Sequence, residues 1–218
     1  MVGDDEAGGH TLFEAGVYAA LFLVIVWGFT LVPSGWLENM TARISSGTLG
    51  ALGFSSSWGA AEGGPYLSLQ GESQLVSVII IRECTAINVF SIAVGLVIPL
   101  RGSSWTRKVL SVVFSAALLL FLNVSRIVLT LLLTGFSFPP FSWFFSNPTV
   151  EVYHYPISFL YGVLGVALLV VVLSRWFVPE LGYTLIGIID SVIGLISGSL
   201  QAPGSGDPEK GEDEGGVG

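Results

Sequence analysis

The sequence predicts an all-α polytopic membrane protein with four to five transmembrane helices, a short extracytoplasmic β-hairpin and an amphipathic C-terminal helix. Of its 218 residues, 52% are hydrophobic and only 11% are charged, and its mean hydropathy is +0.77. This is too apolar for a soluble domain of that length. The apolar residues also gather in runs of about 18 residues or more, enough to cross ~30 Å of hydrocarbon at about 1.5 Å per residue.

Four strong apolar runs are predicted to be transmembrane helices: 11–32, 83–100, 108–130 and 155–175. A fifth run, 181–200, has small or polar residues at every third or fourth position, which favours an amphipathic interfacial helix, with a fifth span as the alternative. These runs make 11–200 a single membrane domain. The segments 1–10 and 201–218 are predicted to be acidic tails, the second of them disordered.

The segment between the first two spans, 33–73, is rich in Gly and Ser and is predicted to be a long loop. Its continuation, PYLSLQGESQLVSVIII, alternates and then becomes β-branched, with GES as a turn. This pattern predicts a short hairpin that leads into the second span, whose helix then begins near Glu83.

Basic residues predict the orientation of the spans. The connection RGSSWTRK (101–108) carries the densest positive cluster and is therefore expected to be cytoplasmic. This places the loops 33–73 and 136–154 on the outer side. The net charge of −8 and the scarcity of Lys and Arg argue against nucleic acid as a partner. A single cysteine excludes an internal disulfide and a cysteine-based zinc site, and neither a metal nor a cofactor is expected.

Three polar side chains stand out in this apolar sequence. Cys84, Arg126 and His154 lie 17, 18 and 21 residues from the basic residues that mark the cytoplasmic ends of their spans. At about 1.5 Å per residue, each lies roughly 25–32 Å from that side, which is one membrane thickness. We therefore predict that all three residues reach the outer face. Pro156 suits a first helical turn, so His154 is expected just outside its helix.

Helical periodicity places further polar residues near these three. Asn88 shares a face with Cys84, and Asn123 and Thr130 share a face with Arg126. Stripes of small and polar residues face neighbouring helices rather than lipid. The candidate residues for substrate binding or for support of the site are Glu83, Asn88, Asn123, Thr130 and Glu151.

These residue types together suit acyl transfer through a thioester. A cysteine at a helix N-terminus with Arg and His nearby is a good nucleophile. The imidazole can take the thiol proton and return it to a leaving amine, and the guanidinium can bind an oxyanion or a carboxylate. Taken singly, however, Cys84 suits helix packing, Arg126 an ion pair with Glu83 or Glu151, and His154 an ordinary place at the interface.

At these residues the chain resembles the exosortase/archaeosortase family of integral membrane enzymes of the cysteine transpeptidase kind. The matching pieces are GPYLSLQGESQLVSVIIIRECTAIN, NVSRIV and HYPISFLYG, and the resemblance covers about residues 65–175. The resemblance implies that Cys84 is the nucleophile, that Arg126 positions the substrate or binds the oxyanion, and that His154 is the base. It makes 11–200 a catalytic domain.

The resemblance also implies a substrate class and a location. Its substrates are secreted proteins with a C-terminal signal of motif, transmembrane helix and basic cluster, which are cleaved through a thioester and passed to water or to a membrane lipid amine. The location is the prokaryotic cell membrane, multi-pass, with the active site on the extracytoplasmic face. The alternative is a non-enzymatic small membrane transporter or helical scaffold.

Overall fold

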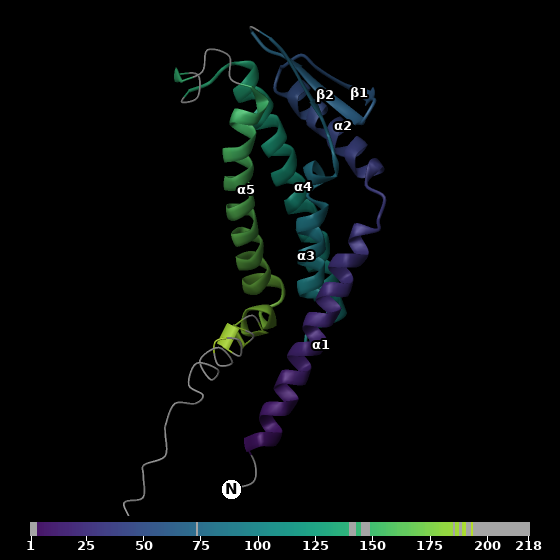
Figure 1. Ribbon diagram of the computed structural model, residues 1–218, viewed down its shortest axis with the longest axis vertical. Helices are drawn as coiled ribbons and strands as arrows, with labels where there is room; N and C mark the ends of the chain where they lie inside the picture. The colour runs from purple at the N-terminus through teal and green to yellow at the C-terminus, as the bar shows by residue number, and fades with distance from the viewer. Residues whose placement is uncertain are drawn as a thin grey trace, which may run out of the picture.

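In the computed structural model, the described residues are 4–72, 74–139, 143–144, 149–184, 186–187, 189–190 and 193, with side chains described from residue 14 onward. Long helices run along the molecule, and a small sheet lies at one end (Figure 1). Helix α1 (Asp4–Thr30) packs on α3 (Ile87–Val97), α3 on α4 (Trp105–Gly135), and α4 on α5 (Val150–Val172). A π-helical turn, η3 (Leu173–Phe177), continues α5.

Among the described residues, fewer helices than predicted can span a membrane alone. Helix α4 and the combined α5–η3 are each long and apolar enough, with 18-residue stretches whose mean hydropathy is 2.2 and 2.5. The part of α1 from Glu14 to Thr30 is long and apolar enough to cross a membrane only when it is taken together with α2 (Gly35–Ala51), to which it is bent by 75°. The described residues thus contain two such helices, or three if the bent pair is one span, against the four to five predicted for the whole chain.

The predicted second span, 83–100, is not a continuous helix, which corrects the sequence prediction. A short 3-10 turn, η1 (Arg82–Thr85), precedes α3, which has only 11 residues. Between them Ala86 adopts a left-handed conformation with φ of 58°, which interrupts the helix. Helix α1 begins at Asp4, inside the predicted tail 1–10. The predicted tail 201–218 and much of 181–200 lie outside the described residues.

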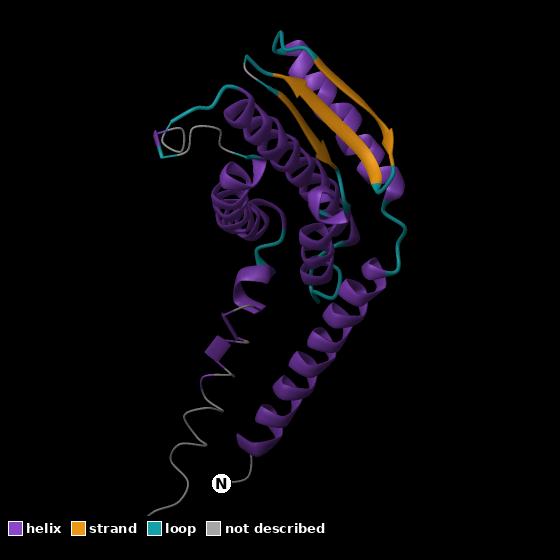
Figure 2. Ribbon diagram, turned by 45° about the horizontal axis from the view of Figure 1, so that its top comes forward, coloured by secondary structure: helices purple, strands orange, loops and turns teal. Residues whose placement is uncertain are grey.

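The predicted hairpin is confirmed, but it belongs to a three-stranded antiparallel sheet. Strands β2 (Gly64–Gln70) and β3 (Leu75–Ile79) pair with Leu67 opposite Val78, and β1 (Ser56–Ala61) adds a third strand beside β2. Helix α2 covers one face of this sheet (Figure 2). The helix occupies much of what was predicted to be a loop, which is a second correction.

Helix α2 packs closely on its neighbours because mostly small residues line its buried face. The buried positions recur at helical spacing and fit closely against β2 and α4: Thr41, Ala42, Ser45, Ser46 and Leu49. This face of α2, the sheet and the C-terminal half of α4 enclose a first core cluster, which includes Leu67, Leu69, Val128 and Leu131. A second cluster joins α3, α4 and η3 farther along the molecule.

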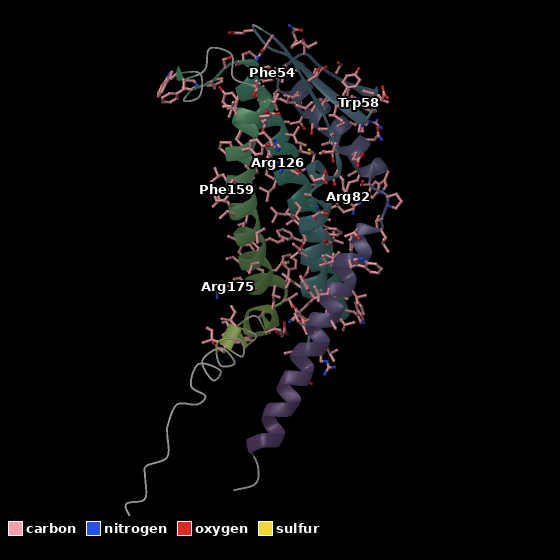
Figure 3. The ribbon with its side chains drawn as sticks, in the orientation of Figure 1. Phe54, Trp58, Arg82, Arg126, Phe159 and Arg175 are labelled. Atoms are coloured by element: carbon pink, nitrogen blue, oxygen red, sulfur yellow. The ribbon has the colours of Figure 1, made fainter. Side chains whose placement is uncertain are left out.

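The two ends of the molecule differ in charge. Arg175 lies at the end of α5 that is far from the sheet, whereas Phe54 and Trp58 lie at the sheet end (Figure 3). Arg101, in the connection between α3 and α4, pairs with Glu14 of α1 at 2.7 Å. Glu180 accepts a hydrogen bond of 2.8 Å from Ser103 in the same connection. A hydrogen bond from its own backbone N–H, and then the one from Ser103, hold the pKa of the Glu180 carboxyl below its usual value.

Candidate active site between the Cys84 turn, α4 and α5

Cys84 lies in the turn that leads from the sheet into α3. After β3 the chain stays extended at Ile81 and then forms η1, within which the Cys84 N–H donates to the Ile81 carbonyl at 2.8 Å. Helix α3 begins at Ile87, three residues after Cys84 and not near Glu83 as predicted. The partly buried Cys84 side chain packs against the core cluster beneath the sheet.

Helix α4 presents a polar stripe to this turn, as the periodicity predicted. Asn123, only 5% exposed, donates a hydrogen bond from its side-chain amide to the backbone carbonyl of Cys84. One turn further on, the Arg126 guanidinium interacts electrostatically with Cys84. Thr130 is also buried, but its hydroxyl donates to the Arg126 carbonyl of its own helix at 2.8 Å. Two side chains of α4 therefore fix or face the Cys84 turn.

Arg126 has no carboxylate partner in the described structure. Neither Glu83 nor Glu151 forms a salt bridge with it, and its Nε atom is buried without a hydrogen-bond partner among the described residues. Figure 3 shows Arg126 on the side of α4 that faces α5. An unpaired guanidinium in an apolar setting is costly unless it receives an anionic or strongly polar group. Arg126 is therefore suited to bind such a group.

His154 lies inside α5, which corrects the expectation that it precedes the helix. Helix α5 begins at Val150, so Pro156 is in its second turn and His154 belongs to the helix. The half-buried imidazole lies 3.3–3.5 Å from the Ser158 hydroxyl, one turn away on the same face. It also interacts electrostatically with Arg126. In the described structure no hydrogen bond joins His154 to Cys84, so Arg126 is the residue that interacts with both.

A cavity of about 90 Å³ lies between the Cys84 turn, α4 and α5. Glu83 and Ala86, on either side of Cys84 in the sequence, line it together with Asn123 and Arg126. From α5 it is lined by Tyr161, Gly162 and Gly165. The small residues leave the space, and Arg126 and Glu83 place one positive and one negative group in its otherwise largely apolar wall. It is large enough for a small polar group rather than for a whole substrate.

The remaining candidate residues are placed differently. Glu83 is exposed and lines the cavity, in agreement with its predicted position next to Cys84. Asn88 and Glu151 are exposed and do not line it. In the described part of the chain, no three His, Cys, Asp or Glu side chains come close enough together to hold a metal ion.

Sequence reasoning missed the contribution of Ala86 to the site. Its left-handed conformation separates η1 from α3 and leaves Cys84 in a turn rather than in a helix. No residue-type signal predicts this, because the left-handed conformation favours Gly or Asn over Ala. Gly162, which lines the cavity from α5, was also missed, although its spacing of three from Gly165 is typical of a helix-facing stripe.

Apolar helices of spanning length, with the Arg126 guanidinium in the wall of a cavity that Cys84 and His154 do not themselves line, define an integral membrane protein with a polar site in its helical part. The chain belongs to the transmembrane exosortase family (Exosortase_EpsH), whose model matches residues 9–147, more than half of its length. The match contains Cys84 and Arg126 and ends before His154. No curated protein and no solved structure gives a match. Membership of this family confirms the resemblance and indicates a membrane sorting enzyme.

Proposed function

We propose that the protein is an integral membrane cysteine peptidase or transpeptidase that cleaves the C-terminal sorting signal of secreted surface proteins. The observation that carries this proposal is the position of Arg126, whose buried Nε has no hydrogen-bond partner in the described structure and whose side chain lines the cavity between the Cys84 turn and α5, the helix of His154. In this proposal Cys84, Arg126 and His154, which are far apart in the sequence and chemically complementary, act in one site. A scaffold or transporter gives no reason for this combination.

In the proposed reaction, His154 takes the proton of the Cys84 thiol, and the thiolate attacks the scissile carbonyl carbon. The carbonyl oxygen becomes an oxyanion, which the Arg126 guanidinium stabilises with its charge and its N–H donors. When the C–N bond breaks, the imidazolium of His154 gives its proton to the leaving amine, and a thioester remains on Cys84. Water or a lipid amine then attacks the thioester and restores the thiol.

The structure supports separate roles for the two polar residues of α4. The Asn123 side-chain amide is bonded to the backbone carbonyl of Cys84, and while that bond persists the amide does not bind the reacting carbonyl of the substrate. Arg126 has a buried Nε without a hydrogen-bond partner in the described structure, so it can accept a new charged group without losing an existing bond. Asn123 therefore positions the nucleophile, and Arg126 stabilises the charge that forms.

The proposed substrates carry a recognition motif, a transmembrane helix and a basic cluster at their C-termini. The substrate helix lies in the membrane beside α4 and α5, where the side chains that face outward are large and apolar, as in Phe159, which is 74% exposed (Figure 3). The motif then reaches the cavity from the extracytoplasmic side. The basic cluster stays on the cytoplasmic side of a multi-pass protein in a prokaryotic cell membrane.

Hydroxylamine trapping tests the thioester. The purified protein in lipid is mixed with a secreted protein that is encoded near its gene and ends in motif, helix and basic cluster. A thioester reacts with hydroxylamine to give a hydroxamate at the new C-terminus and a free Cys84 thiol, which mass spectrometry detects. We expect the hydroxamate with the wild type and none with Cys84→Ala. Cleavage that yields only a carboxylate at high hydroxylamine concentration would contradict a thioester mechanism.

A further inference from the structure

A second cavity lies on the other side of the Cys84 turn, and its walls are apolar. It has a volume of about 310 Å³ and lies between the break that separates α1 from α2, the start of α3, and α4. Its lining includes Phe29, Val32, Met40, Phe90 and Leu120. The hydroxyl of Thr85, a polar residue in its wall, donates to the Arg82 carbonyl at 2.7 Å. The cavity therefore suits a ligand part without polar atoms.

This apolar cavity and the Arg126 cavity are neighbours. Ala86 and Leu119 line both of them, so the turn from Glu83 to Ala86 separates a polar space from an apolar one. Glu83 faces the polar side, and Thr85 faces the apolar side. A ligand in the apolar cavity thus lies against the turn that carries Cys84 without entering the Arg126 cavity.

A cation stands at the rim of the apolar cavity. The Arg82 guanidinium donates 2.8 Å and 2.6 Å hydrogen bonds to the carbonyls of Val32 and Phe29, two residues of the cavity lining. Figure 3 shows Arg82 between α3 and the end of α1. No carboxylate pairs with Arg82 in the described part of the chain. A guanidinium has five N–H donors, so the two bonds to carbonyls leave others for an anion.

The geometry points to a phospholipid-binding site, with an acyl chain in the apolar cavity and the phosphate on Arg82. Charge complementarity selects this occupant, because a phosphate and a guanidinium form strong charge-assisted hydrogen bonds. An extended peptide in the same cavity would leave backbone N–H and C=O groups unpaired, whereas an acyl chain has no polar groups to satisfy. Trp36 lines the cavity and is 63% exposed, as expected of an indole at the headgroup level.

Photocrosslinking in nanodiscs tests this site. The probe is phosphatidylglycerol with a diazirine in one acyl chain, and the comparison probe is diacylglycerol with the same chains and no phosphate. After irradiation and digestion, mass spectrometry locates the adducts. We expect phosphatidylglycerol adducts on Met40, Phe90 or Leu120 at several times the yield of diacylglycerol adducts. Equal yields from the two probes, or adducts spread evenly over the apolar surface, would overturn the proposal.

Two variants probe the two halves of the site separately. Arg82→Gln should lower the yield at these residues roughly fivefold to tenfold, as the loss of a charge-assisted hydrogen bond predicts, and Arg82→Lys should retain most of it. Ala116→Phe, which places a ring in the cavity, should lower the yield from both probes. The matched controls, Arg175→Gln and Ala167→Phe, lie away from the cavity and should change nothing.

Unchanged yields in both Arg82→Gln and Ala116→Phe would also refute the site. A folding defect in Arg82→Gln is recognised by its thermal unfolding, and Ala116→Phe, which leaves the Arg82 bonds in place, then decides the question. The crosslinking does not depend on cleavage. Cys84→Ala should bind the lipid like the wild type, so that failure of this inference and failure of the proposed function remain distinguishable.

Discussion

The side-chain amide of Asn123 donates a hydrogen bond to the backbone carbonyl of Cys84, which ties the middle of α4 to the turn before α3. This bond joins residues that are 39 positions apart. Because Asn123 is buried, the bond forms away from water, where an unpaired carbonyl or amide is costly. This bond and the packing of Cys84 against the core cluster beneath the sheet together hold the Cys84 turn over α4.

Replacement of Asn123 by Leu should therefore affect both stability and processing. The substitution leaves the Cys84 carbonyl unpaired in a buried site, which costs about 1–3 kcal/mol, and it frees the turn to move. Thermal unfolding in detergent measures the first effect, and processing of a co-expressed substrate measures the second. Asn39→Ala is the control, since Asn39 is exposed and bonds only within its own helix. Wild-type stability and processing in Asn123→Leu would show that the bond has no positioning role.

The rate of processing should depend on the guanidinium group of Arg126 and not on its positive charge alone. Arg126→Lys keeps the positive charge but loses the planar set of donors, and loss of a donor to an oxyanion costs about a hundredfold to a thousandfold in rate. We expect both Arg126→Lys and Arg126→Gln to be inserted into the membrane and to lose processing. Time courses with a co-expressed substrate measure the rate. A fully active Arg126→Gln would remove Arg126 from the mechanism.

His154 and Ser158 can be separated by mutation. His154→Gln removes the proposed base and should slow processing about a hundredfold or more. Ser158→Ala removes only a hydroxyl that lies 3.3–3.5 Å from the imidazole nitrogens and should slow it far less. Single-turnover rates over a range of pH distinguish a base from an orienting group, because only loss of the base should change the shape of the pH profile. Equal rates for His154→Gln and the wild type would refute the assignment.

Gly71, which follows β2, lies so close to Gly135 at the end of α4 that no side chain should be tolerated there. A Cβ atom there would lie 2.2 Å from the Gly135 carbonyl oxygen, which is backbone and cannot move aside freely. Gly71→Ala should therefore lower the thermal stability of the protein through overpacking, by about 1–3 kcal/mol. Gly47→Ala is the matched control: Gly47 is exposed in α2, and nothing lies within 4 Å of an added Cβ. That variant should be neutral or more stable, by up to about 1 kcal/mol.

The sequence predicted the buried polar face of α4 because polar residues in an apolar helix are informative. The spacing of Asn123, Arg126 and Thr130 on α4 places them on one inward face, and in the structure Asn123 and Thr130 are buried. Counting from basic residues predicted that Cys84, Arg126 and His154 lie at one depth in the membrane, which stays a prediction; the structure places Arg126 in the cavity between the Cys84 turn and α5, the helix of His154. Helix periodicity and membrane thickness are strong constraints, so these predictions needed few assumptions.

Other features depend on tertiary contacts that no local pattern contains. The buried face of α2 consists largely of Thr, Ala and Ser, so it lacks the large apolar residues that usually mark a helix, and Gly47 and Gly50 suggested a loop. Ala86 takes a left-handed conformation that only its surroundings can impose. The 83–100 run is apolar enough for a span, but this interruption leaves α3 with 11 residues.

Processing by the Cys84→Ala variant tests the central claim most directly. The variant and the wild type are each expressed with a secreted protein that ends in motif, transmembrane helix and basic cluster, and the size and C-terminus of that protein are measured by mass spectrometry. Equal amounts of each variant in the membrane are the condition for comparison. Our account predicts cleaved substrate with the wild type and only full-length substrate with Cys84→Ala. Complete cleavage by Cys84→Ala would contradict it.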